Sequence, residues 1–268
     1  MSAFAGDFTG PLGLQLYSLR ESFKKDVPGT LDKVKALGFK TAELYSGMPG
    51  DPEQVKQMLT ERGITAISGH FSYDALKKDI APAIAMAKTF GLKYAGVAWI
   101  PHEVGNFGEA DVKRAAADFH QFAEAFKKEG IQFYYHVHGY EFRPVTEGSS
   151  ETFFDLLARE TKPELVSFEL DVFWVVHPGA DPVKLLEKYP GRWVFMHVKD
   201  IRKGARTGVY TGKADLKDDV AIGTGQVDWP SVFRAASKSG VRHYFIEDES
   251  PTVEEQIPAS LKYLETLK

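Results

Sequence analysis

Residues 193–200 read WVFMHVKD, an apolar run that ends in polar and charged side chains. Trp193, Val194, Phe195 and Met196 are typical of a buried strand, but a histidine, a lysine and an aspartate follow at once. Seven further short runs of apolar or β-branched residues are bounded by turns: LGLQLYSL (12–19), TAELY (41–45), TAISGHF (65–71), YAGVAWI (94–100), QFYYHVH (132–138), VSFELDV (166–172) and HYFIEDE (243–249). We interpret all eight runs as strands, most of which carry polar side chains at or just after the C-terminal end.

Amphipathic segments separate these runs, and several of them open with Asp or Pro and close at Gly, as capped helices do. The clearest are residues 28–38, 51–63, 110–130, 181–189 and 228–240. Eight strand-then-helix units within 268 residues are typical of an α/β fold of the (β/α)8, or TIM, barrel type. The rival is a doubly wound open sheet, which more often carries a glycine-rich phosphate loop after its first strand, and GLQLYSLRES (13–22) has no such loop. The sequence therefore predicts a single TIM barrel domain over residues 1–268.

Composition excludes several classes of function. The chain has 33 Lys and Arg against 37 Asp and Glu, a formal charge of -4, and no basic run, which argues against a nucleic-acid partner. It has no cysteine, which excludes disulfides, thiolate catalysis and a Cys-ligated zinc site. An apolar run long enough for a membrane span is missing, so we expect no membrane partner and a soluble protein. The expected compartment is the cytoplasm, or the periplasm if a signal segment has been removed.

In a TIM barrel the catalytic groups lie at the C-terminal ends of the strands. Candidate polar side chains at these ends are Gln15, Tyr17, Glu43, His70, His136, His138, Glu141, Glu169, Asp171, His197, Lys199, Glu247 and Glu249. Side chains alternate along a strand, so the pairs at 136/138, 169/171, 197/199 and 247/249 each share a face and converge if that face points inward. Burying several carboxylates together is costly unless a cation compensates them. The pattern thus favours a divalent-metal site, with a hydrogen-bonded polar plug as the alternative.

The segments YHVHGYEF, ELDVFW, HVKD, GTGQVDW and FIEDE, in this order, resemble the sugar phosphate isomerase/epimerase family, the xylose isomerase-like TIM barrels that are related to AP endonuclease family 2. The resemblance extends from LQLYSLR to IEDES and implies one divalent ion held by Asp171, His197 and Glu247. Sugar epimerases of the family usually have a glutamate near the end of strand five. His136 stands there in this chain, so we expect it to be the fourth ligand, with Glu141 as the alternative. Mn²⁺ is the first expectation for the ion, and Mg²⁺, Zn²⁺ and Co²⁺ suit the same donors.

The expected reaction follows from such a site. A divalent ion that chelates adjacent oxygens of a polyol or keto-sugar stabilises the enediolate made when a proton leaves. We expect a sugar isomerase or epimerase on a small carbohydrate, with a lyase or dehydratase on a keto-sugar, inosose or 3-keto-glycoside as the alternative. A non-catalytic sugar-binding barrel is the remote alternative, and 8 histidines with an acidic balance disfavour the multi-metal chemistry of endonuclease IV. Whether the chain forms a homo-oligomer stays open.

The sequence also suggests roles for individual residues and segments of the site. The candidate catalytic residues are Glu247, Glu141, His138 and Lys199, and the candidate substrate-binding residues are Tyr17, Glu43, His70 and Trp174. The segment from Arg202 to Gly225 is too long for a simple strand-to-helix connection and predicts a lid or rim loop. GTGQVDWP lacks a third glycine of a nucleotide loop, so we interpret it as a turn into a helix capped by Asp228.

Overall fold

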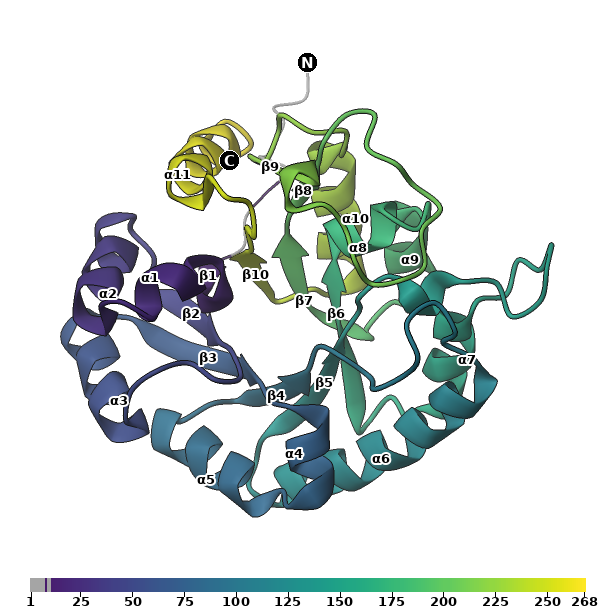
Figure 1. The fold of residues 1–268 in the computed structure, drawn as a ribbon, viewed down its shortest axis with the longest axis horizontal. Coiled ribbons are helices and arrows are strands. Elements are labelled where there is room, and N and C mark those ends of the chain that lie inside the picture. The colour runs from purple at the N-terminus through teal and green to yellow at the C-terminus, as the bar shows by residue number, and fades with distance from the viewer. Residues whose placement is uncertain (1–7, 9–10) are drawn as a thin grey trace.

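The computed structural model describes residue 8 and residues 11–268 and has eight parallel strands in one closed barrel (Figure 1). The barrel strands are β1 (Leu12–Gln15), β2 (Thr41–Leu44), β3 (Thr65–His70), β4 (Tyr94–Val97), β5 (Gln132–His136), β6 (Val166–Asp171), β7 (Trp193–Val198) and β10 (His243–Ile246). They pair in the order β1-β10-β7-β6-β5-β4-β3-β2, and β1 closes the ring against β2. The predicted (β/α)8 barrel is confirmed.

Helices surround the strands on the outside of the barrel (Figure 1). They are α1 (Arg20–Phe23), α2 (Val27–Ala36), α3 (Pro52–Glu61), α4 (Tyr73–Lys78), α5 (Ala81–Phe90), α6 (Glu109–Lys128), α7 (Phe153–Glu160), α8 (Val172–Val176), α9 (Pro182–Lys188), α10 (Trp229–Ser239) and α11 (Val253–Glu265). Asp51, Asp181 and Asp228 each cap a helix that has Pro in its first turn, and Asp228 accepts from the N–H of Ser231, as expected. No helix in the described part of the chain combines the length and apolar content that crossing a bilayer requires.

Strand register brings the polar strand ends to one level. His136 pairs with Glu169 across β5 and β6, and Asp171 pairs with His197 across β6 and β7. Each predicted strand begins at the predicted residue but ends one to four residues earlier, because its last residues leave the ladder. Gln15 shows why: its side chain accepts from the N–H of Tyr17 and so starts a turn. The C-terminal ends therefore provide turns and side chains for a site.

The segment from Arg202 to Gly225 is anchored at its base. It begins directly after β8 (Asp200–Ile201), contains β9 (Asp219–Val220), which pairs with β8 in a separate antiparallel sheet, and ends in the turn before α10. Asp200 accepts from the N–H groups of Gly223 (2.9 Å) and Gly225 (3.1 Å). A β-carbon at Gly225 would lie 2.1 Å from Oδ1 of Asp200, so this position requires glycine. The glycine-rich turn binds a carboxylate of its own chain.

The middle of the same segment lies against a neighbouring strand end. A β-carbon at Gly212 would lie 2.7 Å from Trp99 and 2.8 Å from Tyr140, so the backbone packs directly on these two rings. Trp99 follows β4, and Tyr140 lies in the turn after β5. The segment from Arg202 to Gly225 thus lies over the barrel's C-terminal rim, and we call it the rim loop.

Candidate metal centre and substrate cavity

Four buried side chains from consecutive strands converge at the C-terminal end of the barrel, and we call them the ligand cluster. They are His136 at the end of β5, Asp171 of β6, His197 of β7 and Glu247 just after β10, and one donor atom of each lies within 4.8 Å of the others. Nε2 of His136 is 3.1 Å from Nδ1 of His197 and 3.5 Å from Oδ2 of Asp171. Oε2 of Glu247 is 3.3 Å from Nδ1 of His197. The structure brings together the four residues expected as ligands.

The donor atoms of the ligand cluster fit a divalent ion. Oδ1 of Asp171 accepts from the N–H of Trp174, whereas Oδ2 makes no hydrogen bond to any described residue and faces the two imidazoles. Burial alone would raise the pKa of Asp171, but Lys199 and the neighbouring histidines outweigh it and lower the pKa to about 2. The carboxylate is therefore ionised at neutral pH. Two nitrogen and two oxygen donors suit Mn²⁺, Zn²⁺ or Co²⁺, and the positive charge compensates the buried carboxylates.

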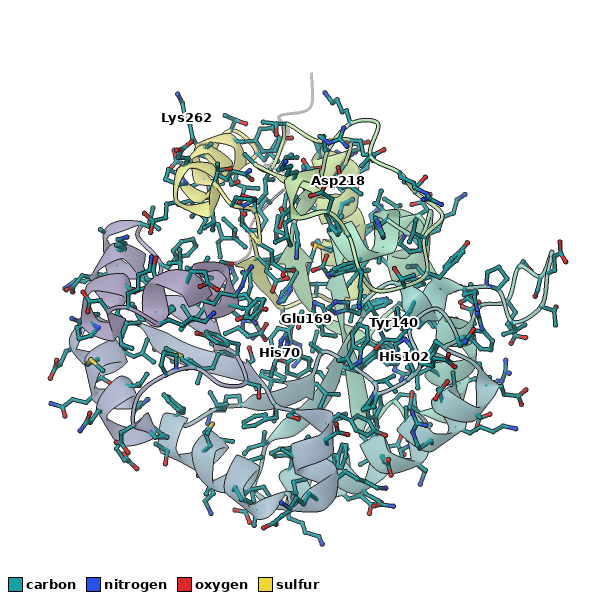
Figure 2. The ribbon with its side chains drawn as sticks, viewed as in Figure 1. His70, His102, Tyr140, Glu169, Asp218 and Lys262 are labelled. Carbon is teal, nitrogen blue, oxygen red and sulfur yellow. The ribbon has the colours of Figure 1, made fainter. Side chains whose placement is uncertain are left out.

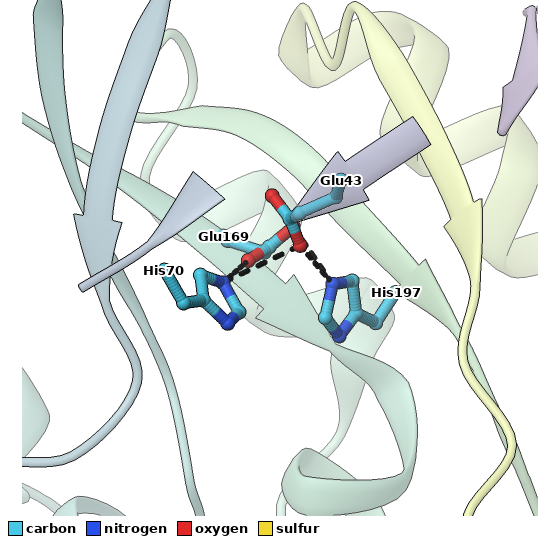
Figure 3. A group of neighbouring side chains, drawn as sticks. All are labelled: Glu43, His70, Glu169 and His197. Carbon is cyan, nitrogen blue, oxygen red and sulfur yellow. Dashed lines mark hydrogen bonds and ion pairs between the residues drawn. The ribbon is translucent and has the colours of Figure 1, made fainter. Parts of the chain in front are cut away.

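A second group of side chains lies on the other side of His197 and consists of Glu43, His70 and Glu169, which we call the supporting cluster (Figure 3). Nε2 of His197 is 2.8 Å from Oε1 of Glu43 and 3.0 Å from Oε1 of Glu169. Nε2 of His70 is 2.9 Å from Oε2 of Glu169. His197 therefore presents Nδ1 to the ligand cluster and Nε2 to carboxylates, which is the usual arrangement of a metal-binding histidine.

Glu43 is the most heavily bonded member of the supporting cluster. It accepts from Nε2 of Gln15 (2.8 Å) and Oγ of Ser68 (2.6 Å), in addition to its contact with His197. Burial would raise the pKa of Glu43, but His70 and His197 outweigh it and lower the pKa to about 2. Glu43 was expected to bind substrate, yet its side chain is fully buried. We interpret Glu43 as a residue that can orient His197, and its contact with substrate stays a prediction.

The ligand cluster opens into a cavity of about 390 Å³, the first compartment. His136 and Glu247 line it, as do the expected substrate-binding residues Tyr17 and His70. Much of the rest of the wall is aromatic and includes Tyr45, Phe71, Tyr73 and Trp99. Figure 2 shows His70 and Glu169 near the centre of the barrel, with Tyr140 and His102 to one side. A small ligand in this compartment would reach the ligand cluster directly.

A second compartment of about 280 Å³ adjoins the first. His138 and Glu249 line both compartments. Phe173, Trp174 and Lys199 line the second compartment, and residues 212–216 of the rim loop form another part of its wall. The ring of His138 stacks on Trp174 with a centroid distance of 4.5 Å, so these two side chains form one aromatic platform.

Lys199 is buried among three carboxylates. Its Nζ is 3.1 Å from Oε2 of Glu247, 2.5 Å from Oε1 of Glu249 and 3.9 Å from Oδ2 of Asp219. Burial would lower the pKa of Lys199, but these carboxylates raise it well above its usual value, so the ammonium stays charged. Its charge is largely compensated within the protein.

His138 and Glu141 lie on one turn but differ in where they point. Burial lowers the pKa of His138 to about 3, so the ring is neutral, and Nδ1 has no hydrogen-bond partner among the described residues. Glu141 is fully buried outside the ligand cluster, and Oε1 accepts from the N–H of His138 (2.8 Å) and the hydroxyl of Tyr135 (2.9 Å). Burial raises the pKa of Glu141 to about 7. Arg143, the expected alternative partner of Glu141, donates to backbone carbonyl oxygens.

Three acidic residues of this region had no assigned role in the sequence interpretation. Glu169 lies two residues before Asp171, and strand alternation had put it on the converging face without giving it a role. Glu249 likewise lies two residues after Glu247. Asp219 comes from β9 in the rim loop, and nothing in its sequence neighbourhood signals that it approaches Lys199.

Comparison with known proteins gives consistent results. A family model for xylose isomerase-like TIM barrels matches residues 31–267. Inosose dehydratase of Lacticaseibacillus casei is 23% identical over 251 residues, which cover 81% of this chain and 79% of the relative. Inosose dehydratase of Clostridium perfringens is 23% identical over 265 residues, which cover 89% of this chain and 88% of the relative.

Solved structures have the same fold. The crystal structure of a sugar phosphate isomerase/epimerase from Parabacteroides distasonis has a TM-score of 0.77 and 25% identity, and the match covers 98% of this chain and 95% of that one. The IOLI protein, solved with a bound zinc atom, has a TM-score of 0.71 and 14% identity, which shows likeness of fold, with coverage of 96% and 97%. With the match of the family model over residues 31–267, these likenesses show that the chain belongs to the xylose isomerase-like TIM barrel family.

Proposed function

We propose that this protein is a divalent-metal-dependent lyase that removes a proton next to the carbonyl group of a keto-sugar or keto-cyclitol and expels a β-substituent. The observation that supports this most is the ligand cluster, whose His136 and Glu247 line a cavity large enough for a small carbohydrate. The inosose dehydratase relatives and the zinc-bound neighbour support the proposal.

Different residues would hold the ion, contact the substrate and position the site. His136, Asp171, His197 and Glu247 would hold the ion, which when bound supplies the positive charge that an adjacent developing oxyanion requires. His138 lines this cavity as a neutral ring, and a pKa of about 3 makes it a weak base, so it could accept a hydrogen bond from a substrate hydroxyl. Glu249 offers a carboxylate to the same space. Glu141 acts as a positioning residue because it holds the backbone N–H of His138.

Elimination is favoured over epimerisation by where the carboxylates lie. Epimerisation requires proton-transfer groups on opposite faces of one carbon. Glu247 and Glu249 both follow β10, and Glu141 faces away from the cavity. Asp74, the remaining carboxylate among the described residues of the first compartment, is exposed on α4. Elimination requires removal of a proton from only one face of the substrate carbon, which this arrangement suits.

Isomerisation is the second candidate, and the sequence had put isomerisation or epimerisation first. It also requires a proton to leave and return on one side of the sugar, which Glu247 and Glu249 could serve. The sugar phosphate isomerase/epimerase structure from Parabacteroides distasonis supports it. The inosose dehydratase relatives and the carboxylates that follow β10 support elimination as our first candidate.

The test is incubation of the Mn²⁺-loaded protein in deuterated water with a panel of ketoses, inososes and 3-keto-glycosides, followed by NMR. We expect one class to lose a β-substituent in a metal-dependent manner. Deuterium incorporation with rearrangement but without loss of a substituent would identify an isomerase. Binding of a panel member without exchange or product would identify a sugar-binding barrel. Chelated protein is the control for all three outcomes.

A further inference from the structure

The second compartment shares two lining residues with the first compartment but is chemically different from it. Both compartments are lined by His138 and Glu249, so a ligand in the first meets the second across these two side chains. We propose that the second compartment is a subsite for a second, uncharged unit of the substrate, an inference that rests on the proposed function. The substrate would then be a neutral two-unit carbohydrate such as a glycoside, rather than a monosaccharide or a sugar phosphate.

A buried, unpartnered donor supports the subsite. Trp174 lines the second compartment and is only 5% exposed, yet its Nε1 has no hydrogen-bond partner among the residues that the structure describes. An indole N–H can only donate, and leaving it unpaired in a buried place is unfavourable. Because Trp174 lines the compartment, a hydroxyl or ring oxygen of a ligand that reaches this nitrogen would satisfy it. Together with His138, which stacks on it, the indole adds apolar surface to the wall against which a sugar ring could pack.

The charges of both compartments disfavour a phosphate. Of the described residues that line the first compartment, none is Lys or Arg, whereas Glu247 and Glu249 are carboxylates. In the second compartment Lys199 already pairs with Glu247, Glu249 and Asp219. Lys213 is exposed and shares the wall with Asp215. A phosphate group would therefore meet carboxylates without an uncompensated buried cation, which is the opposite of a phosphate site.

The rim loop gives the second compartment its outer wall, so it would determine the length of the substrate. Residues 212–216 contribute five consecutive wall positions. Gly212 packs on Trp99 and Tyr140, which ties this stretch to the ends of neighbouring strands. Leu216 is 43% exposed and lines the compartment, so a larger side chain there has room to reach into it.

The first experiment compares ligands at equilibrium. Binding of glucose, glucose 6-phosphate, maltose, cellobiose and trehalose to the Mn²⁺-loaded protein would be measured by calorimetry. We expect at least one disaccharide to bind roughly tenfold or more tightly than glucose, because it gains the contacts of the second compartment. We expect glucose 6-phosphate to bind more weakly than glucose. The proposal is overturned if no disaccharide binds more tightly than glucose, or if the phosphate improves binding.

The second experiment uses variants and follows the ratio of disaccharide to glucose affinity. Leu216→Trp should lower this ratio by filling the compartment, and the matched variant Lys217→Trp should not, because Lys217 is the next residue and does not line the compartment. Trp174→Phe keeps a ring but removes the N–H, and should lower the ratio roughly threefold to tenfold. Equal effects of Leu216→Trp and Lys217→Trp, or an unchanged ratio in Trp174→Phe, would contradict the subsite.

The two proposals fail separately. If the disaccharide advantage and its loss in Leu216→Trp are found but no proton exchange or elimination occurs in deuterated water, the subsite stands and the lyase proposal falls. If elimination proceeds equally well on one-unit and two-unit substrates, the lyase proposal stands and the subsite falls.

Discussion

Replacing Glu43 by Gln tests whether the supporting cluster controls the metal site. Oε1 of Glu43 lies 2.8 Å from Nε2 of His197, and a carboxylate there keeps the proton on Nε2 and leaves Nδ1 free to bind an ion. The amide has nearly the same shape but no charge. A hydrogen bond to a charged group contributes about 1.5–3 kcal/mol and a neutral one about 0.5–1.5 kcal/mol, so the change should cost about 1–1.5 kcal/mol of metal binding. This corresponds to a roughly tenfold higher Kd for Mn²⁺.

The assay is a direct Mn²⁺ titration of apo protein, with thermal unfolding in parallel. At a fixed excess of metal, a tenfold rise in Kd should remove about 1.4 kcal/mol of the stabilisation that the metal gives. Ser68→Ala is the control, since Oγ of Ser68 bonds the other carboxylate oxygen and the contact of Glu43 with His197 remains. A folded Glu43→Gln protein with the wild-type Kd would refute the coupling between Glu43 and the metal site.

Four further predictions address the ligands, the turn after β5 and the rim loop. Mn²⁺-loaded protein should contain about one ion per chain by elemental analysis, and Asp171→Ala should reduce this to background. His136→Ala should lower metal affinity roughly tenfold or more, whereas Glu141→Ala should keep the metal and lose turnover, because it removes the acceptor of the His138 N–H; the reverse result would exchange their roles. The pKa of Glu141 is raised from 4.5 to about 7 in the folded protein. The stability that this group contributes to the folded state is therefore fully present below pH 4.5 and is lost as the pH rises through 7. Urea unfolding should show a fall of about 3 kcal/mol over that window from this group, absent in Glu141→Gln. Gly225→Ala should destabilise by roughly 1–3 kcal/mol, because its β-carbon would overlap Asp200, and wild-type stability would contradict the anchoring of the rim loop.

The fold could be predicted because each strand is bounded by local signals. Turn residues and helix caps such as Asp51 and Asp181 stand where the chain changes direction, and their hydrogen bonds are local. The strand ends could not be predicted to the residue. Glu247 continues the alternation of β10 in sequence, but the ladder ends at Ile246 because the paired strand β7 ends opposite it.

The ligand cluster could be predicted for a related reason: barrel symmetry brings equivalent strand positions to one level. The alternation of side chains along a strand does not predict which residues meet across the barrel. Glu43 and Glu169 come from strands far apart in the sequence, and only closure of the ring brings both to His197. For Glu141, the positive φ of Gly139 (92°) turns the chain so that the carboxylate meets the N–H of His138, and no periodic pattern encodes that turn.

The charges around Lys199 connect the rim loop with the ligand cluster. A lysine so close to the ligand cluster looks like a ready partner for an oxyanion, as its position at the end of β7 suggests. Glu247 and Glu249, which both follow β10, compensate it, and Oδ2 of Asp219 from the rim loop lies 3.9 Å from its Nζ, so Lys199 adds little net positive charge to the cavity. At the ligand cluster, a divalent ion held by two imidazoles and two carboxylates would be a stronger Lewis acid than one held by three carboxylates and a single imidazole, because one negative charge fewer surrounds it. We therefore expect an ion bound there to supply most of the positive charge that reaches a substrate oxygen, which is consistent with the proposed neutral carbonyl substrate.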